Sequence, residues 1–512
     1  MMTLLSRYRW AMRSLLLITL LAGSIAHAAL ELPAIFSDHA VLQREQAVPV
    51  WGWAAPGQEV TVSMFGEPVK ATADAAGKWR VNLKPHPSIA KPATLIITAD
   101  KETKTIHDVL IGEVWLGSGQ SNMAMTVSRA KDYEKEKAAA ALPQIRMFTE
   151  KSGGSDSAQD RCKGEWVVCA PETVGGFSAT AYFFGKQIHQ ALDLPVGLIN
   201  SSVGGTPIES WISPEAQRAS AELKPFFEML KNEDASFDAD KAKALFAKQL
   251  AAWKEAAKKA RAEGKPVPRA PRDPVAQRGR KANVGGLFNG KIAPLIPYAI
   301  RGTLWYQGEA NSNGDKGRFY QHQLPLLVKD WRTRWGKEFP FAWVQLPNFV
   351  SNRDGWMLVR EAALKALQSV PKSGMAVTLD VGEARDIHPK NKQAVGERLA
   401  RWALGTVYGQ AGATSGPLPV KHEIKGSEFS VTFSHTDKGL MLREASGSGF
   451  VIAGADKVWH PAKARIEGDS VILSSKAVTQ PVAVRYAWAE MPEVTLWNGA
   501  GLPASQFRTD EW

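Results

Sequence analysis

Cysteine is scarce in this chain, because only Cys162 and Cys169 occur among its 512 residues. Two sulfurs without a neighbouring pair of histidines argue against a zinc site, so no metal is expected. In an oxidising compartment the two thiols are predicted to close a small disulfide that ties their loop. Two free thiols are the alternative.

Long apolar runs are also lacking beyond the first residues, and none reaches the roughly 20 residues that span a bilayer. Arg7, Arg9 and Arg13 precede an apolar stretch at 15–22, which ends in small residues up to Ala28. This order is typical of a secretory signal, with cleavage predicted after Ala28. The apolar stretch is too short for the alternative, a membrane anchor. The chain is therefore expected to be periplasmic or secreted, without stable membrane insertion.

An excess of positive charge is present, but it is confined. The net charge is +12, and the segment 241–281 holds thirteen lysines or arginines and only three acidic residues. This segment is rich in helix formers and then in prolines, which predicts a basic helical insertion on the surface. Attraction to an anionic envelope or a polyanionic glycan is the alternative. Nucleic acid is not an expected partner.

The length exceeds what one hydrophobic core usually supports, so two or three domains are expected. After the signal at 1–28, short strands separated by turn residues predict a β-sandwich over 29–107. Strands and helices alternate over 108–410, which predicts a parallel sheet with covering helices. A helical insertion at about 213–281 interrupts this part. Strands return over 415–512 as a second β-rich domain.

Helical periodicity is clearest at 179–191, 356–370 and 392–408. Together with the alternating strands, these segments place the central part in the α/β class. No repeat of fixed period relates the two β-rich parts.

Apolar strands run directly into polar or reactive residues at five places, near Ser121, Gly204, Gln307, Asn348 and His388. The loops at the carboxyl ends of parallel strands meet at one edge of an open sheet, so these residues are expected to converge. A serine, glycine backbone donors, an amide and an imidazole are the parts of an acyl-transfer site.

The frame Gly-x-Ser-x-Gly is absent around Ser121, because Met123 stands where the second glycine would be. A serine just past the first strand, followed by Asn122, suits flavodoxin-like hydrolases instead. The chain resembles the sialate O-acetylesterase family within the SGNH (GDSL-like) hydrolases. The stretches that carry this resemblance are 37–44, 115–123, 204–211, 288–295, 305–311, 386–392 and 501–510. It departs from the family at Lys291, where methionine is common, and in the length of its basic insertion.

The resemblance implies a flavodoxin-like SGNH core and a serine esterase mechanism. Ser121 would be the nucleophile, His388 the base, and Asp386 the residue that fixes the imidazole tautomer. The spacing Asp-x-His is tighter than the Asp-x-x-His usual in the superfamily. Asp380, at the preceding strand end, is therefore the alternative acid.

The resemblance also implies an oxyanion hole. Its donors would be the backbone amides of Ser121 and Gly204 with the side-chain amide of Gln307. Gly205 is the alternative to Gly204. Glu309 and Asn311 are expected to brace the Gln307 loop.

The resulting prediction is a metal- and cofactor-independent esterase that releases acetate from O-acetylated sialic acid through an acetyl-enzyme intermediate. Trp211 would stack on the sugar, and Arg385 would hold the sialate carboxylate. Two other functions stay open. One is deacetylation of xylan or another polysaccharide, and the other is glycan binding without catalysis. Oligomeric state is not predicted.

Overall fold

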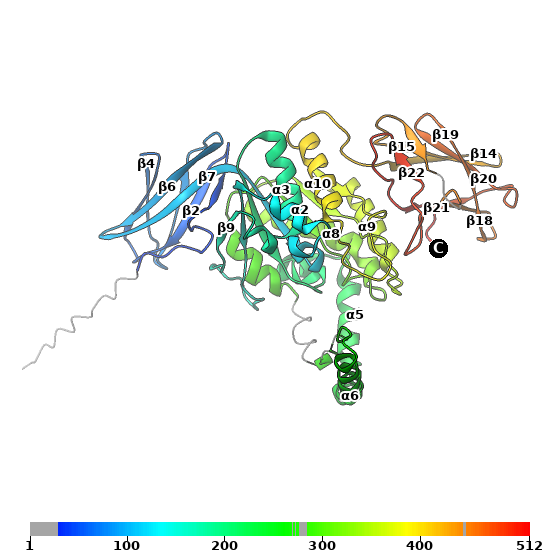
Figure 1. Ribbon diagram of the computed structural model, residues 1–512, viewed down its shortest axis with the longest axis horizontal. Coiled ribbons are helices and arrows are strands. Elements are labelled where there is room, and N and C mark those ends of the chain that lie inside the picture. Colours follow the sequence, from blue (N-terminus) through cyan, green and yellow to red (C-terminus); the bar gives the residue numbers. More distant parts are fainter. Residues whose placement is uncertain (1–28, 269, 272, 276–283, 444–446) are drawn as a thin grey trace, which may run out of the picture.

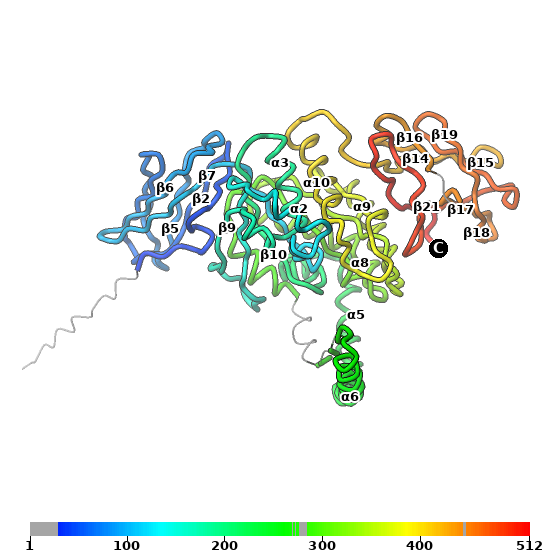
Figure 2. Tube along the Cα trace, in the orientation of Figure 1, coloured from blue at the N-terminus to red at the C-terminus, as the bar shows by residue number. Residues whose placement is uncertain are grey.

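The computed structural model describes residues 29–268, 270, 271, 273–275, 284–443 and 447–512. The predicted signal segment lies outside these residues. A central α/β body lies between two β-rich parts, and the helices α5 (Lys224–Ala235) and α6 (Ala239–Ala262) extend from the body as an arm (Figure 1). The chain passes through the three parts in order, from blue to red in Figure 2. No helix of the described residues combines the length and apolarity needed to cross a bilayer.

The amino-terminal part is built from antiparallel strands with one buried face. In β5 (Lys78–Leu83), exposed and buried side chains alternate, as expected of a strand packed on a core on one side. This strand pairs with β2, while β3 pairs with both β4 and β6. The other strands are β1 (Val41–Gln43), β2 (Val48–Trp53), β3 (Glu59–Met64), β4 (Glu67–Thr72) and β6 (Ile89–Ala99).

The long strand β7 (Glu102–Gly119) belongs to two sheets. Its first half pairs with β6, and from Glu113 onward it pairs with β10 of the central sheet. The border predicted at residue 107 therefore falls inside one continuous strand. Since β7 continues directly into the turn that carries Ser121, the amino-terminal part and the candidate site share one rigid element.

The central sheet has the strand order β13-β12-β11-β7-β10-β8-β9. All neighbours from β13 to β8 are parallel, and β9 is antiparallel to β8. The sheet is therefore mixed. Its other strands are β8 (Leu142–Thr149), β9 (Trp166–Cys169), β10 (Val196–Ser202), β11 (Gly302–Tyr306), β12 (Phe341–Val344) and β13 (Ser373–Ala376).

Helices cover both faces of this sheet. Alternate residues of β7 face opposite layers, so Leu116 belongs to one hydrophobic cluster and Trp115 to another. The cluster with Leu116 contains residues of α8 (Lys316–Trp335) and α9 (Trp356–Ser369). The cluster with Trp115 contains residues of α3 (Ala179–Leu192) and α10 (Lys392–Thr406). The helices predicted at 179–191, 356–370 and 392–408 are confirmed.

Two of these helices begin with a polar residue whose side chain caps the first turn. The hydroxyl of Ser178 accepts from the backbone N–H of Ala181 at the start of α3, and Asn391 caps α10 in the same way. The shorter helical elements are α1 (Ser121–Ala124), η1 (Val127–Arg129), α2 (Tyr133–Ala138), η2 (Val174–Gly176), η3 (Ile208–Ser210), α4 (Pro214–Ala219), η4 (Phe288–Ile292) and η5 (Ala293–Leu295). The insertion is helical through α4, α5 and α6, as predicted, and its end at 276–281 lies outside the described residues.

The carboxyl-terminal part is again β-rich. Two four-stranded antiparallel sheets have the orders β14-β15-β20-β19 and β18-β17-β21-β23, and β16 pairs with β22. The strands are β14 (Leu418–Lys425), β15 (Glu428–Ser434), β16 (Leu440–Leu442), β17 (Phe450–Ala453), β18 (Trp459–Pro461), β19 (Lys463–Glu467), β20 (Ser470–Ser474), β21 (Ala483–Tyr486), β22 (Leu496–Asn498) and β23 (Phe507–Arg508).

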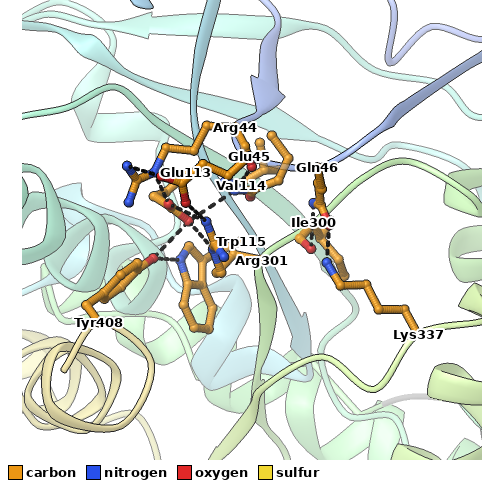
Figure 3. Close-up of polar contacts among 11 residues, drawn as sticks. Arg44, Glu45, Gln46, Glu113, Val114, Trp115, Ile300, Arg301, Lys337 and Tyr408 are labelled. Carbon is orange, nitrogen blue, oxygen red and sulfur yellow. Dashed lines mark hydrogen bonds and ion pairs between the residues drawn. The ribbon is translucent and has the colours of Figure 1, made fainter. Parts of the chain in front are cut away.

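A buried carboxylate joins three parts of the chain (Figure 3). Glu113 of β7 accepts from Arg44 at 2.5 Å and from Arg301 at 2.6 and 2.9 Å. The hydroxyl of Tyr408, beyond α10, donates to the same carboxylate at 3.0 Å. Burial alone would raise the pKa of Glu113, but the two guanidinium groups outweigh it and lower that pKa. Glu113 is therefore a charged link between the amino-terminal part, the sheet and the end of α10.

The predicted disulfide is wrong. Cys162 and Cys169 are both free and buried. The first belongs to the cluster on the α8 side of the sheet and the second to the cluster on the α3 side. Burial raises the pKa of Cys162 to about 11 and that of Cys169 to about 12, so both stay protonated thiols at neutral pH.

Candidate active site

Residues from three separate strand ends line one pocket of about 960 Å³. Ser121 follows β7, Gly204 follows β10, and His388 lies in the loop between β13 and α10. The pocket lies at the carboxyl edge of the sheet beside β7. The strand order reverses at β7, because β10 pairs with one side of it and β11 with the other. Open α/β sheets bind ligands at such a point. The structure thus brings a serine, a glycine and a histidine together from distant parts of the sequence.

The turn that carries Ser121 requires glycine at position 119. Gly119 has φ = 132°, and a Cβ atom there would lie 2.2 Å from the carbonyl oxygen of Tyr306 in β11. This close approach lets Gln120 donate its backbone N–H to the same carbonyl at 2.9 Å. Gly204 packs directly on the serine, because a Cβ atom on Gly204 would lie 3.4 Å from Cβ of Ser121.

His388 lies beside Asp386. Its Nδ1 atom is 3.5 Å from Oδ1 of the carboxylate, and the same oxygen accepts the backbone N–H of His388 at 3.0 Å. Burial is the main cause that lowers the pKa of His388; the cations of Lys392 and Arg129 lower it further, and Asp386 opposes them. The imidazole is therefore neutral at physiological pH and able to accept a proton.

Asp380 is engaged elsewhere. Arg398 of α10 holds both its carboxylate oxygens, each at 2.6 Å. This bidentate pair leaves Asp380 as a link between the end of β13 and α10. The local geometry favours Asp386 as the carboxylate that orients His388.

The Gln307 amide is buried and already bonded to protein oxygens. Its Nε2 atom donates to Asn311 at 2.7 Å and to the carbonyl of Thr206 at 3.2 Å, and its oxygen accepts from Tyr320. Asn311 in turn donates to Glu209 at 2.9 Å. Asn311 thus braces the Gln307 loop, as predicted, while Gln307 must exchange a partner before it can donate to a substrate.

The arm and its neighbours form the outer wall of the pocket. Leu230, Glu233 and Asp234 of α5 line it together with Phe237. Glu233 forms an ion pair of 3.0 Å with Lys316 at the start of α8. The basic insertion therefore shapes the pocket through its first long helix.

Two predicted substrate contacts do not lie where the sequence suggested. Trp211 is fully buried, and its indole N–H donates to Thr206 at 3.0 Å, so its ring has no face open to a sugar. Arg385 is exposed and lies outside the pocket lining. Arg129 and Arg353 line the pocket instead. The only sequence signal for Arg129 was its position eight residues after Ser121, and motif analysis alone gave it no role.

Two buried ionisable residues were also missed as functional candidates: Glu309, which lines the pocket, and Lys392, which does not. Glu309 is 1% exposed and Lys392 is fully buried. Burial raises the pKa of Glu309 and lowers that of Lys392 to about 7. Both lie within motifs that carried the resemblance. The described residues contain no cluster of three or more histidine, cysteine, aspartate or glutamate side chains arranged to hold a metal ion.

A mixed α/β sheet whose strand ends bring a serine, a glycine and a histidine to one pocket is an arrangement found in carboxylic ester hydrolases, and this chain is one. It belongs to the carbohydrate esterase family of sialic acid-specific acetylesterases. The sequence model of that family matches residues 111–258 and 290–405, which include the residues that line the pocket except Pro274 and Val284.

Similar proteins agree with this family. The chain is 28% identical to the sialate O-acetylesterase of Mus musculus, over 89% of this chain and 88% of that protein. It is 27% identical to the sialate O-acetylesterase of Homo sapiens, over 91% and 90% respectively. The crystal structure of a carbohydrate acetylesterase from Xanthomonas citri superimposes with a TM-score of 0.79 at 34% identity, covering 94% of this chain and all of that one.

Proposed function

We propose that the chain is an exported serine esterase that removes O-acetyl groups from sialic acids and releases acetate. The observation that carries the proposal is the shared pocket of Ser121, Gly204 and His388, with Asp386 beside the imidazole. The sialate O-acetylesterases that this chain resembles supply the substrate class. Export rests on the signal pattern of residues 1–28.

The proposed fold is a flavodoxin-like SGNH core. If β8 and β9 are set aside as additions beyond β10, the remaining parallel strands are β10-β7-β11-β12-β13. In chain order this is 2-1-3-4-5, the doubly wound order of flavodoxin. The proposed domains keep the borders expected from the sequence, with β7 shared by the first two.

The proposed mechanism has two steps. The Ser121 hydroxyl attacks the acetyl carbonyl while His388 takes its proton, and the same proton then passes to the departing sugar oxygen. Water then attacks the acetyl carbonyl while His388 takes its proton. The bond to the Ser121 oxygen breaks, His388 returns the proton to that oxygen, and acetate leaves. The backbone N–H groups of Ser121 and Gly204 support the negative oxygen in both steps.

In the described residues, Ser121 and His388 are not hydrogen-bonded to each other. Catalytic hydrogen bonds of this kind often tighten only when substrate binds. The low pKa of His388 supports its role, because a neutral imidazole is the form that accepts a proton. Arg129 and Arg353 line the pocket together with the acidic residues Glu209, Glu233, Asp234 and Glu309, and Glu233 is already paired with Lys316. The two guanidinium groups are therefore the groups proposed to bind the carboxylate of a sialate.

A neutral polysaccharide is the second candidate substrate. The Xanthomonas citri relative at 34% identity is described only as a carbohydrate acetylesterase, which leaves its sugar open. The test is acetate release by the mature chain from O-acetylated sialic acid and, in parallel, from acetylated xylan, each with Ser121→Ala. Serine-dependent release from sialate alone supports the proposal. Preference for xylan retains the mechanism and overturns the substrate, and activity that survives Ser121→Ala overturns the mechanism.

A further inference from the structure

Buried side chains hold the backbone carbonyls on both sides of His388. The carbonyl of Ile387 accepts from Nδ2 of Asn122 at 3.0 Å, and the carbonyl of Pro389 accepts from Nζ of Lys392 at 2.7 Å. Asn122 and Lys392 are both fully buried. Asn122 directly follows the proposed nucleophile, so the same contacts tie the base to the serine turn.

Asn122 and Lys392 also fix each other. The ammonium group donates to Oδ1 of Asn122 at 2.7 Å, and it lies 5.4 Å from the ring centroid of Tyr306. The second hydrogen of the Asn122 amide goes to Glu309 at 2.5 Å. Each polar atom of the Asn122 side chain therefore has a defined partner, which leaves its amide a single orientation.

This arrangement is costly for the fold. A lysine without solvent loses its hydration, which is why burial lowers the pKa of Lys392 to about 7. Buried ionisable groups with strongly shifted pKa values concentrate at functional sites. Lys392 does not line the pocket and is the first residue of α10. Its contacts join that helix, the His388 loop and the Ser121 turn.

We propose that Lys392 is a positioning residue that, through Asn122 and the Pro389 carbonyl, holds the His388 ring in place for proton transfer from Ser121. The inference rests on the proposed roles of Ser121 and His388. Lys392 touches neither substrate nor reacting atoms. A displacement of about 1 Å in such a site costs about 100-fold in rate, so a change at Lys392 is expected to act on kcat rather than on KM.

The test compares two buried lysines of the full mature chain. Lys392→Met removes the ammonium group from the His388 loop. Lys291→Met is the control, because Lys291 is 2% exposed, forms an ion pair with the buried carboxylate of Glu150, donates to the carbonyls of Glu150 and Ser152 at 2.8 and 3.0 Å, and lies outside the pocket lining. With an aryl acetate, Lys392→Met is expected to lower kcat about 100-fold with KM changed less than about twofold. Lys291→Met is expected to lower the melting temperature while kcat stays within about twofold.

Equal kcat losses in the two lysine variants, or a kcat of Lys392→Met within about threefold of the parent, would overturn the proposal. If Lys392→Met does not fold, Asn122→Ala decides. It removes the donor to Ile387 and leaves Lys392 with Pro389, and it is expected to lower kcat with KM unchanged. An unchanged kcat in Asn122→Ala overturns the proposal. Ser121→Ala and His388→Ala run beside these variants, and full activity in either one defeats the proposed function separately.

Discussion

The carboxylate oxygen Oδ1 of Asp386 lies 3.5 Å from Nδ1 of His388 and accepts the backbone N–H of the same residue at 3.0 Å. One oxygen thus contacts both the ring and the backbone of the proposed base. This double contact explains how the short spacing Asp-x-His can work. The aspartate folds back on the histidine two residues later, so the contact between the two residues forms within a single loop.

Asp386→Asn is expected to lower kcat by at least about 100-fold, because the amide no longer favours the reactive tautomer or stabilises the imidazolium. The pKa of His388 should fall as well, since Asp386 is the group that raises it while burial, Lys392 and Arg129 lower it. The acid limb of the kcat/KM profile should therefore move to lower pH. A pH series with an aryl acetate measures both effects.

Asp380→Asn is the control for that experiment. It breaks the bidentate pair with Arg398, so it should lower the melting temperature. Neither kcat nor the acid limb should change as they do for Asp386→Asn. A larger kcat loss in Asp380→Asn would reverse the assignment of the acid.

Much of the site could be predicted from the sequence because its residues stand at strand ends. An apolar strand followed by a polar turn is a local pattern, and parallel strands carry such turns to one edge. The positions of Ser121, Gly204 and His388 followed from this rule. The main helices followed from their periodicity, as α3, α9 and α10 show.

Burial and long-range pairing could not be predicted in this way. Trp211 stands beside a motif, but only the packing shows that its ring is enclosed. Lys392 and Asn122 are 270 residues apart in the sequence, so no local sequence pattern predicts their contact. Cys162 and Cys169 are near in sequence, yet they belong to the clusters on opposite faces of the sheet.

The thiols give a direct prediction. When the mature chain is purified without reductant and then unfolded, two thiols per chain should react with a colorimetric thiol reagent, because both cysteines are free. The folded chain should react slowly, since burial raises both pKa values and shields both sulfurs. A reductant should leave the melting temperature unchanged. If no thiol of the unfolded chain reacted, the two cysteines would be joined in a disulfide after all.

Glu113→Gln is expected to destabilise the fold by about 3 kcal/mol, because it removes the buried carboxylate that Arg44 and Arg301 share and leaves both arginines only the exposed carboxylate of Glu45. The folded state lowers the pKa of Glu113 below its usual 4.5. Its contribution is therefore complete above pH 4.5 and is lost as the pH falls through the lowered value. Urea unfolding at neutral and acidic pH should show the difference between parent and variant shrinking on acidification.

An exposed carboxylate serves as the control for Glu113. Glu59 pairs with Lys70 at 2.7 Å, but both side chains are about 60% exposed. Glu59→Gln should change the free energy of unfolding by less than about 1 kcal/mol. If the two variants were equally stable, the cluster in Figure 3 would not link the three parts of the chain.

Arg129 gives the sharpest test of the proposed substrate. It lines the pocket and is near enough to His388 to lower the pKa of that residue. If its guanidinium binds the sialate carboxylate, Arg129→Gln should raise KM for O-acetylated sialic acid by roughly 10-fold to 100-fold, the usual worth of a charge-assisted hydrogen bond. KM for the methyl ester of the same sugar, which lacks the charge, should not change.

Arg385→Gln, which alters an exposed arginine outside the pocket lining, is the matched control and should leave both KM values unchanged. Equal KM changes for the acid and the ester in Arg129→Gln would show that Arg129 does not bind the carboxylate. A rise in KM for the acid alone in Arg385→Gln would show that Arg385 binds it instead.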